Sequence, residues 1–341
     1  MVVLRIFKYL AITLLTLSVL VAIGFFLGVF GVPTLNSIDN EFGTVNETQT
    51  EIRTNVSVNN PNPIGVSFGG LKIDYTVGMN GISMANGTKT GLSIQTGNSS
   101  LQFVTSLDNT KIPDWWYTHI RNGERTDVTI DATVSHSALG AAPPITQSQT
   151  VTTDIISAFD STETRPIDAN RPLVDDPVLY LNETAGEFGD DLTRERTPIN
   201  LEFTVFNPKA YPYAITEVGY TITMNNITVG EGSTTGEQVV APRSKSTLSA
   251  ATVIQNDRLD QWWVSHLQNE EVTDLKIDFY FVVDPEVPGV EPITIDAEEL
   301  DYETTIETNI LGQTGGSSNA TGGNSTSAAL DDPQAVAVPA T

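Results

Sequence analysis

The histidines are the side chains best suited to acid–base or metal chemistry in this sequence, because the chain has no cysteine. His119 and His266 each follow a pair of tryptophans, and His136 stands apart from both. A zinc site needs several ligands at close spacing, and neither His-x-x-x-His nor His-Glu occurs. We interpret His119 and His266 as imidazoles packed at the edge of a core, and we expect no metal site.

Carboxylates and serines give no clearer catalytic pattern. Short acidic groups occur at Asp175-Asp176, Asp190-Asp191 and Asp284-Pro285-Glu286. They lack the alternating ligand spacing of a calcium loop, so we interpret them as solvated surface. We expect no serine in a Gly-x-Ser-x-Gly nucleophile elbow and no glycine-rich phosphate loop. The sequence predicts no catalytic residue and no cofactor, and an enzyme is the least favoured function.

Both tryptophan pairs belong to one repeated segment, which holds every tryptophan of the protein. Residues 112–120, IPDWWYTHI, return as residues 259–267, LDQWWVSHL. In each copy the apolar residues and the histidine fall at i, i+3, i+4, i+7 and i+8, the stripe of an amphipathic helix lying on a core. We expect buried rings, and exposed rings that stack on sugars are the alternative. The four rings are Trp115, Trp116, Trp262 and Trp263, and Trp116 and Trp263 are expected to be the deeper ones.

The repeat extends beyond these helices at a nearly constant offset of 147 residues. Three pairs carry it: Trp115 with Trp262, His119 with His266, and Asn60-Pro61 with Asn207-Pro208. Solenoid units are about 20 to 50 residues long, so a period of this length indicates two whole domains.

Alternating apolar and polar residues predict strands in both halves. Residues 52–58 and 199–205 alternate up to the Asn-Pro steps, and residues 128–134 and 275–281 alternate after the helices. The pairs Asn80-Gly81 and Asn225-Asn226 favour tight hairpin turns. Repeated antiparallel strands with one short helix indicate an all-β protein built as a β-sandwich.

The segments between these strands are also assigned from composition. We expect a short linker from Pro33 up to the strand at Ile52, and a last strand of the first half near residues 145–156. A linker rich in proline and aspartate is expected around residues 166–177, and the last strand of the second half near residues 293–306.

Each half resembles the late-embryogenesis-abundant type 2 family, also called the water stress and hypersensitive response (WHy) domain. The resemblance covers most of residues 38–310 and is carried by a strand ending in Asn-Pro, a hairpin, an amphipathic helix and a closing strand. It implies two tandem immunoglobulin- or fibronectin-III-like sandwiches, a link to desiccation or osmotic stress, and no catalytic residues. The second copy departs from the pattern after Asn207-Pro208, where Lys209-Ala210 replaces a second Asn-Pro.

An uncharged run of 23 residues, 10–32, is long enough to span a bilayer. Arg5 and Lys8 precede it, so the positive-inside rule predicts a cytoplasmic N-terminus and domains outside the cell. The tail is rich in Gly, Ser, Asn and Thr and is expected to be disordered. The predicted parts are residues 1–9 in the cytoplasm, a transmembrane anchor at 10–32, sandwiches at 33–165 and 166–312, and a tail at 313–341.

The formal net charge of −25, from 42 acidic and 17 basic residues, limits the classes of partner that the protein can bind. Such a surface repels nucleic acid, so none is expected as a partner. The acidity favours solvation in concentrated salt, as in a halophile. The expected partners are the bilayer, through residues 10–32, and an unidentified envelope protein, glycan or lipid.

Asn-x-Ser/Thr sequons are glycosylation candidates in an external protein. They occur at Asn46, Asn86, Asn98, Asn182, Asn226, Asn319 and Asn324, and also at Asn55, which lies within a predicted strand and is expected to be the least accessible. A chain rich in Asn, Ser and Thr also produces several such triplets by chance.

The sequence favours a single-pass cell-membrane protein with tandem extracellular WHy domains, acting without catalysis in stress tolerance or envelope binding. The alternatives are an adhesion or surface-layer-associated module, and a lipid or small-molecule binder if an apolar cavity lies between the sheets.

Overall fold

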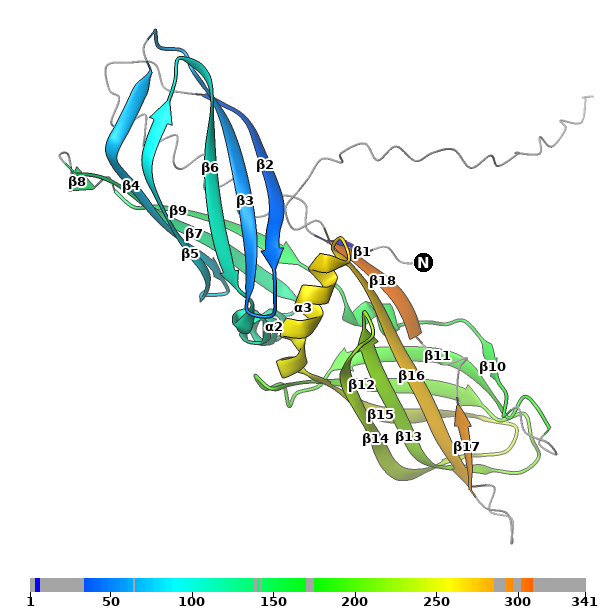
Figure 1. The fold of residues 1–341 in the computed structure, drawn as a ribbon. Helices are drawn as coiled ribbons and strands as arrows, with labels where there is room; N and C mark the ends of the chain where they lie inside the picture. The colour runs from blue at the N-terminus through cyan, green and yellow to red at the C-terminus, as the bar shows by residue number, and fades with distance from the viewer. Residues whose placement is uncertain are drawn as a thin grey trace, which may run out of the picture.

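The computed structural model describes residues 4–6, 34–63, 65–137, 140–141, 143–169, 175–284, 292–296 and 302–308. In these residues the chain is mostly β-strand with two short α-helices, so the all-β prediction is confirmed (Figure 1). None of the described helices is long and apolar enough to cross a membrane. The predicted anchor at 10–32 and the predicted tail at 313–341 lie outside the described residues.

The first half forms one antiparallel sheet of eight strands in the order β2-β3-β6-β5-β4-β7-β8, with β9 also paired to β7. Strands β5 and β6 meet only at Ala85–Leu107 and Asn86–Ser106, so this joint nearly divides the sheet in two. The strands are β2 (Thr34–Val45), β3 (Gln49–Asn60), β4 (Val66–Met79), β5 (Ile82–Ile94), β6 (Gly97–Asp108), β7 (Arg125–His136), β8 (Gly140–Ala141) and β9 (Ile145–Thr152).

The second half contains two sheets, β10-β11-β12-β15 and a six-stranded sheet around β16 and β13. Their inner faces meet at Phe203, whose ring centroid lies 5.2 Å from that of Phe279 and 6.4 Å from that of Phe281. The strands are β10 (Arg165–Ile167), β11 (Leu179–Phe188), β12 (Arg196–Phe206), β13 (Tyr213–Met224), β14 (Ile227–Val240), β15 (Lys245–Gln255), β16 (Val272–Asp284), β17 (Ile293–Asp296) and β18 (Tyr302–Thr308), and β1 (Leu4–Ile6) pairs in parallel with β18.

Both predicted tight turns are confirmed by their backbone angles. The φ values are 49° and 80° at Asn80 and Gly81, and 51° and 63° at Asn225 and Asn226. Positive φ at both central residues defines the type I′ turn, whose twist matches that of the flanking strands.

The turn side chains also fix the hairpins to the strand after the helix. Asn80 donates to the carbonyl of Arg125 and accepts from the amide of Asp127. Asn225 makes the same pair of bonds with the carbonyl of Val272 and the amide of Asp274. The two halves therefore share individual hydrogen bonds as well as strand order.

Four segment assignments need correction. Residues 34–45 form the edge strand β2, although they were expected to be a linker, because their polar side chains show no alternation while their backbone pairs with β3. Strand β9 ends at Thr152, and Ile156 begins the 3-10 helix η2 (Ile156–Phe159). The expected linker at 166–177 begins within strand β10. The last strand of the second half is divided into β17 and β18.

Candidate functional site

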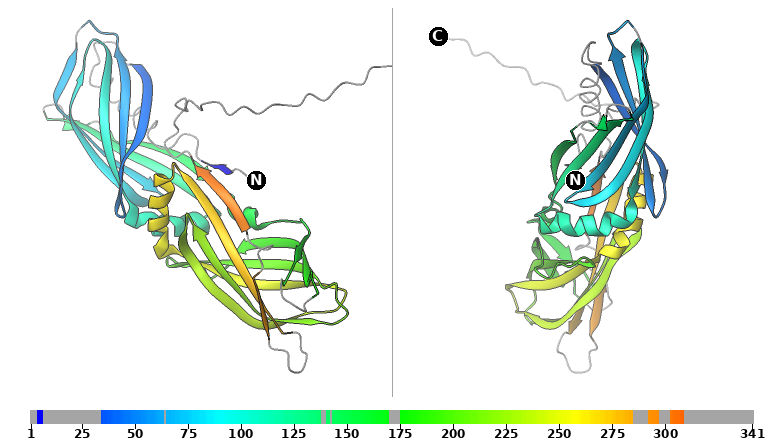
Figure 2. Two further views of the ribbon diagram at one scale, coloured as in Figure 1. Left: turned by 45° about the vertical axis from the view of Figure 1, so that its right-hand side comes forward. Right: turned by 90° about the vertical axis from the view of Figure 1, so that its left-hand side faces the viewer.

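The repeated tryptophan segments form helices α2 (Ile112–Arg121) and α3 (Leu259–Gln268), as predicted. They lie where the two halves meet and pack against each other (Figures 1 and 2). Each follows a short 3-10 helix, η1 (Asn109–Lys111) or η3 (Asn256–Arg258). Pro113 in the first turn of α2 starts that helix, and Gly123 just beyond it has φ 67°.

All four tryptophan rings are buried, between 3% and 7% exposed. The ring of Trp115 meets that of Trp263 at 6.3 Å, and the ring of Trp116 meets that of Trp262 at 6.2 Å, both edge to face. Aromatic rings prefer this arrangement because the positive ring edge faces the negative ring face. We call these four rings the tryptophan quartet, and it joins the two halves.

Trp116 and Trp263 reach across the junction. The Nε1 of Trp116 donates to Oγ1 of Thr197 at 2.9 Å, and the Nε1 of Trp263 donates to Oγ1 of Thr50 at 3.4 Å. Each threonine in turn donates to an asparagine of its own half, Thr197 to Asn256 at 2.8 Å and Thr50 to Asn109 at 2.9 Å. The two rings expected to be deeper are thus the two that enter the opposite half.

The other two rings stay within their own halves and share a threonine with the histidine. Trp115 donates to Oγ1 of Thr126 at 2.9 Å, and this oxygen lies 2.8 Å from Nδ1 of His119. Trp262, Thr273 and His266 repeat these contacts at 2.9 Å and 2.8 Å. The indole can only donate. The threonine hydrogen is then free for the imidazole, which favours a neutral ring with its proton on Nε2.

Burial holds both histidines in this neutral form. Each is 1% exposed, and desolvation lowers the pKa of His119 and of His266 to about 4. Nε2 of His119 lies 2.9 Å from Oγ1 of Thr153, which lies 3.3 Å from a carboxylate oxygen of Glu124. The same oxygen accepts from the amide of Ile155 at 2.6 Å, and burial raises the pKa of Glu124. The imidazole therefore helps to position the chain that leaves β9.

The rim of the junction is polar. Arg194 forms an ion pair with Asp114, and its guanidinium lies 5.4 Å from the ring centroid of Tyr117. These groups are well exposed, so the pair contributes little stability by itself. Among the described residues, no group of three or more His, Asp or Glu is placed to hold a metal.

Trp116 also closes one end of the core of the second half. With Ile155 and Phe159 from the connecting segment, it lines a small apolar cavity whose other walls include Ile199 and Met224. The cavity measures about 10 Å³, close to the space that one water molecule occupies. This space does not accommodate a lipid chain, so it gives no support to a lipid-binding role.

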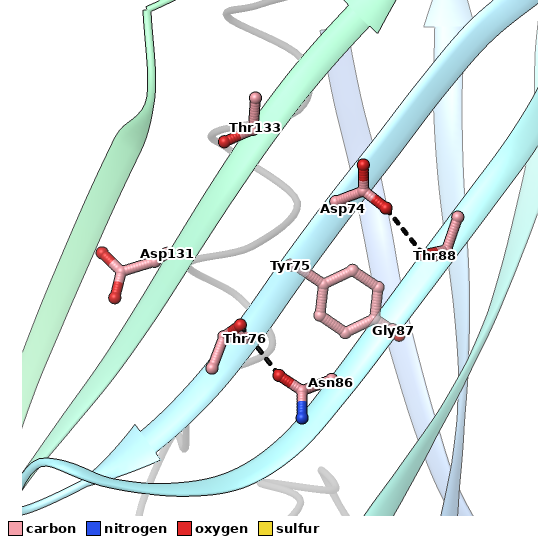
Figure 3. A pocket seen from close by; sticks show the side chains of 8 residues that line it. All are labelled: Asp74, Tyr75, Thr76, Asn86, Gly87, Thr88, Asp131 and Thr133. Atoms are coloured by element: carbon pink, nitrogen blue, oxygen red, sulfur yellow. Dashed lines mark hydrogen bonds between the residues drawn. The ribbon is translucent and has the colours of Figure 1, made fainter.

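A larger, open hollow lies on β4, β5 and β7 (Figure 3). It has a volume of about 430 Å³ and is lined by hydroxyls, amides and carboxylates. Thr88 donates to Asp74 at 2.7 Å and Thr76 to Asn86 at 3.0 Å. Hydrogen bonds from Lys72 and Thr88 lower the pKa of Asp74. These polar groups partly satisfy one another, yet the surface can hydrogen-bond a hydroxylated ligand.

The repeated Asn-Pro steps place a buried asparagine at a strand end. Oδ1 of Asn60, ahead of Pro61, accepts from the amide of Asn62 at 3.1 Å. Oδ1 of Asn207, ahead of Pro208, accepts from the amide of Lys209 at 2.8 Å. In both copies the asparagine Oδ1 therefore accepts a hydrogen bond from the amide two residues later, although Lys209-Ala210 replaces a second Asn-Pro.

The described sequon asparagines differ in accessibility. Asn46, Asn86, Asn98 and Asn226 are exposed, whereas Asn55 and Asn182 are half-buried. Asn226 lies in the β13–β14 turn, and the amide nitrogen of Asn182 donates to Thr164 at 3.1 Å. Asn319 and Asn324 lie outside the described residues.

One serine has the Gly-x-Ser-x-Gly spacing, although no nucleophile elbow was expected. Residues 65–69, GVSFG, have the spacing Gly-x-Ser-x-Gly. Ser67 lies within strand β4, paired with Ser93 of β5, and β4 leads into a hairpin. A nucleophile elbow requires a strand-to-helix turn, so this spacing is not a nucleophile elbow.

The described members of the acidic groups named from the sequence lie at the surface or at the end of a strand. Asp175 forms an ion pair with Lys209 at 3.0 Å. Asp190 and Asp191 line a hollow of about 440 Å³ together with Arg196. Asp284 ends β16 and is followed by residues outside the described part of the chain.

Sequence reasoning missed the polar partners of the quartet. They are Thr50 and Thr197, Asn109 and Asn256, and Thr126 and Thr273. Each pair is separated by the same 147 residues. The occurrence of identical polar residues at the 147-residue offset was the signal that could have revealed these partners.

Comparison with known proteins supports the resemblance. Residues 55–148 match the family model described as late embryogenesis abundant protein (LEA_2). This match confirms the predicted resemblance of this part of the chain to the late-embryogenesis-abundant type 2 family. An uncharacterized protein of Methanocaldococcus jannaschii is 30% identical over 101 residues, which is 29% of this chain. The match spans 58% of the length of that curated relative.

Two solved structures are also similar. A protein from Archaeoglobus fulgidus is 26% identical, with a TM-score of 0.34, and the match covers 38% of this chain and 99% of that chain. A protein from Arabidopsis thaliana is 16% identical, with a TM-score of 0.26, and the match covers 35% and 80% of the two chains.

Proposed function

We propose that this chain is a non-catalytic protein with two tandem WHy-type domains, held in the cell membrane by residues 10–32 and acting outside the cytoplasm in desiccation or osmotic stress tolerance. The observation that carries the proposal is the match of residues 55–148 to the late-embryogenesis-abundant family. The proposal that the chain is non-catalytic is supported by the burial of His119 and His266, each of which contacts a threonine and a tryptophan ring.

We further propose that each half is an immunoglobulin-like sandwich and that the second half, residues 166–312, is a second WHy domain. The contact of Phe203 with Phe279 supports facing sheets in this half. The repeated type I′ turns, helices and Asn-Pro turns support a common origin of the two halves.

The stress role is tested by survival after drying. Host cells that lack this chain should survive dehydration less well, and the full chain should restore survival while a version without residues 10–32 should restore less. Growth in well-watered medium serves as the control. Equal survival of all strains after drying would remove the stress role.

The membrane orientation is tested by cysteine labelling. Because the chain has no cysteine of its own, each introduced cysteine is its single labelling site. In intact cells a membrane-impermeant maleimide should label Glu47→Cys, since Glu47 is exposed, and should label Leu4→Cys only after lysis. The pairing of β1 with β18 instead requires residues 4–6 and 302–308 on one side. Labelling of both variants in intact cells would refute the predicted orientation and support that pairing.

The acidic surface predicts salt-dependent stability. With 42 acidic and 17 basic residues, self-repulsion is poorly screened in dilute buffer, because the Debye length rises from about 3 Å at 1 M to about 30 Å at 0.01 M. The melting temperature of the solubilised protein should therefore rise as KCl increases toward molar concentrations. A neutral osmolyte at equal osmolality is the control. A flat curve would mean that the acidity is no adaptation to salt.

An adhesion or surface-layer-associated module is the second candidate, favoured by the polar hollow of Figure 3. Its lining of hydroxyls and carboxylates suits a glycan. Retention of envelope glycans by the native protein but not by Asp131→Ala would favour this function.

A further inference from the structure

The junction between the halves is symmetric at the level of single residues. Trp115 meets Trp263 and Trp116 meets Trp262, so each ring contacts the repeat equivalent of its own neighbour. The crossing hydrogen bonds, from Trp116 to Thr197 and from Trp263 to Thr50, are also equivalent. An interface in which residue i contacts j and j contacts i is that of a two-fold dimer. In this protein a single chain supplies both sides of the interface.

The connection between the halves is short, and the hydrogen bonds at its two ends go to different halves. Ile155 donates its amide to Glu124 of the first half. Phe159 is buried against the second half, where its carbonyl accepts from Thr184 and the amide of Gly186 donates to Asp160. Residues 156–158 separate these two sets of hydrogen bonds, and a separation there leaves the strand pairing within β2–β9 and within β10–β18 intact.

We propose that two copies of this chain exchange halves, so that α2 of one copy packs on α3 of the other and the reverse. Both junctions of the exchanged dimer keep the tryptophan quartet and its threonine hydrogen bonds. Packing that is broken when one chain opens is therefore formed again between the two chains. Domain exchange of this kind needs no new surface.

Concentration decides which form is populated. Within one chain the second half is held at an effective concentration on the order of millimolar, so the closed monomer dominates below that range. Removal of water raises the protein concentration and favours exchange. Copies of charge −25 repel each other, so salt also favours it. Water loss is also the condition under which the proposed stress role operates, so the biological meaning of exchange rests on that proposed function. The exchange itself can be measured whether or not the stress role is correct.

The test uses two full chains in detergent, one with Asp114→Cys and one with Arg194→Cys. These rim residues face each other across the junction, and their side chains are 40% and 60% exposed. The two chains are mixed at micromolar concentration, concentrated by removal of water, diluted again and treated with a short bis-maleimide. The exchanged dimer should give a crosslinked pair at least tenfold more abundant than the same mixture that was never concentrated.

A chain carrying both substitutions crosslinks within itself and defines the full yield. The matched control replaces Arg194→Cys by Asp278→Cys, whose side chain is 41% exposed on the outer face of β16. Equal yields from the two mixtures would show random collision and overturn the proposal, as would a yield unchanged by concentration. Neither result would bear on stress survival, so exchange and the proposed function fail separately.

Discussion

Replacing Trp116 by alanine is expected to destabilise the second half of the chain, although the residue belongs to the first. The ring is 3% exposed and closes the core of the second half beside Ile199 and Met224. Removing a buried aromatic ring costs about 3 to 5 kcal/mol, because apolar surface returns to water and a cavity remains. Thr197 is also deprived of its indole donor.

The measurement is hydrogen exchange followed by mass spectrometry, with thermal unfolding alongside. Protection of β12 in the second half should fall together with that of β7 in the first. Tyr117→Ala, at the next and less buried position, is the matched control and should cost less than about 1 kcal/mol. Loss of protection confined to the first half would contradict the view that Trp116 stabilises both.

Acid is expected to destabilise the fold through its buried histidines. The pKa of His119 and of His266 falls from the ordinary 6.5 to about 4 in the folded chain. The unfolded chain therefore binds a proton at a higher pH than the folded chain does. Stability is fully present above pH 6.5 and is lost as the pH falls toward 4, by up to about 3 kcal/mol for each histidine.

Other groups titrate in the same window, so the prediction is a difference between proteins. The carboxyl of Glu124, reached from His119 through Thr153, has a raised pKa and opposes the effect by favouring the fold in acid. His119→Gln and His266→Gln keep a polar side chain that does not titrate. Relative to the wild type, the double variant should gain stability as the pH falls from 6.5 to 4. Parallel pH profiles would show that the imidazoles do not control acid stability.

Local sequence patterns determined the elements at the centre of the molecule. The spacing in residues 112–120 and 259–267 predicted helices α2 and α3, because a stripe repeating every three to four residues needs no partner to define it. The pairs Asn80-Gly81 and Asn225-Asn226 predicted their turns, because a positive φ is a property of the residues themselves. The 147-residue offset indicated the duplication.

Strand β2 could not be predicted from local sequence patterns. Its side chains carry no alternating pattern, and its structure depends on hydrogen bonds from its backbone to β3, which is a property of the pairing. The serine at position 67 shows the opposite case. A motif is present there, but the strand around it removes the geometry that the motif needs.

The sequence by itself determined that the tryptophans lie on the apolar stripe of two helices and are buried. Only the tertiary structure decided what buries them. A stripe specifies which side of a helix leaves water, but it contains no information about the identity of the covering surface. Here Trp116 of the first half packs on the core of the second half and donates to Thr197, and Trp263 of the second half donates to Thr50 of the first. Hydrophobic burial is non-directional, so the choice of partner depends on shape and on hydrogen-bonding threonines that meet the rings only after the chain has folded.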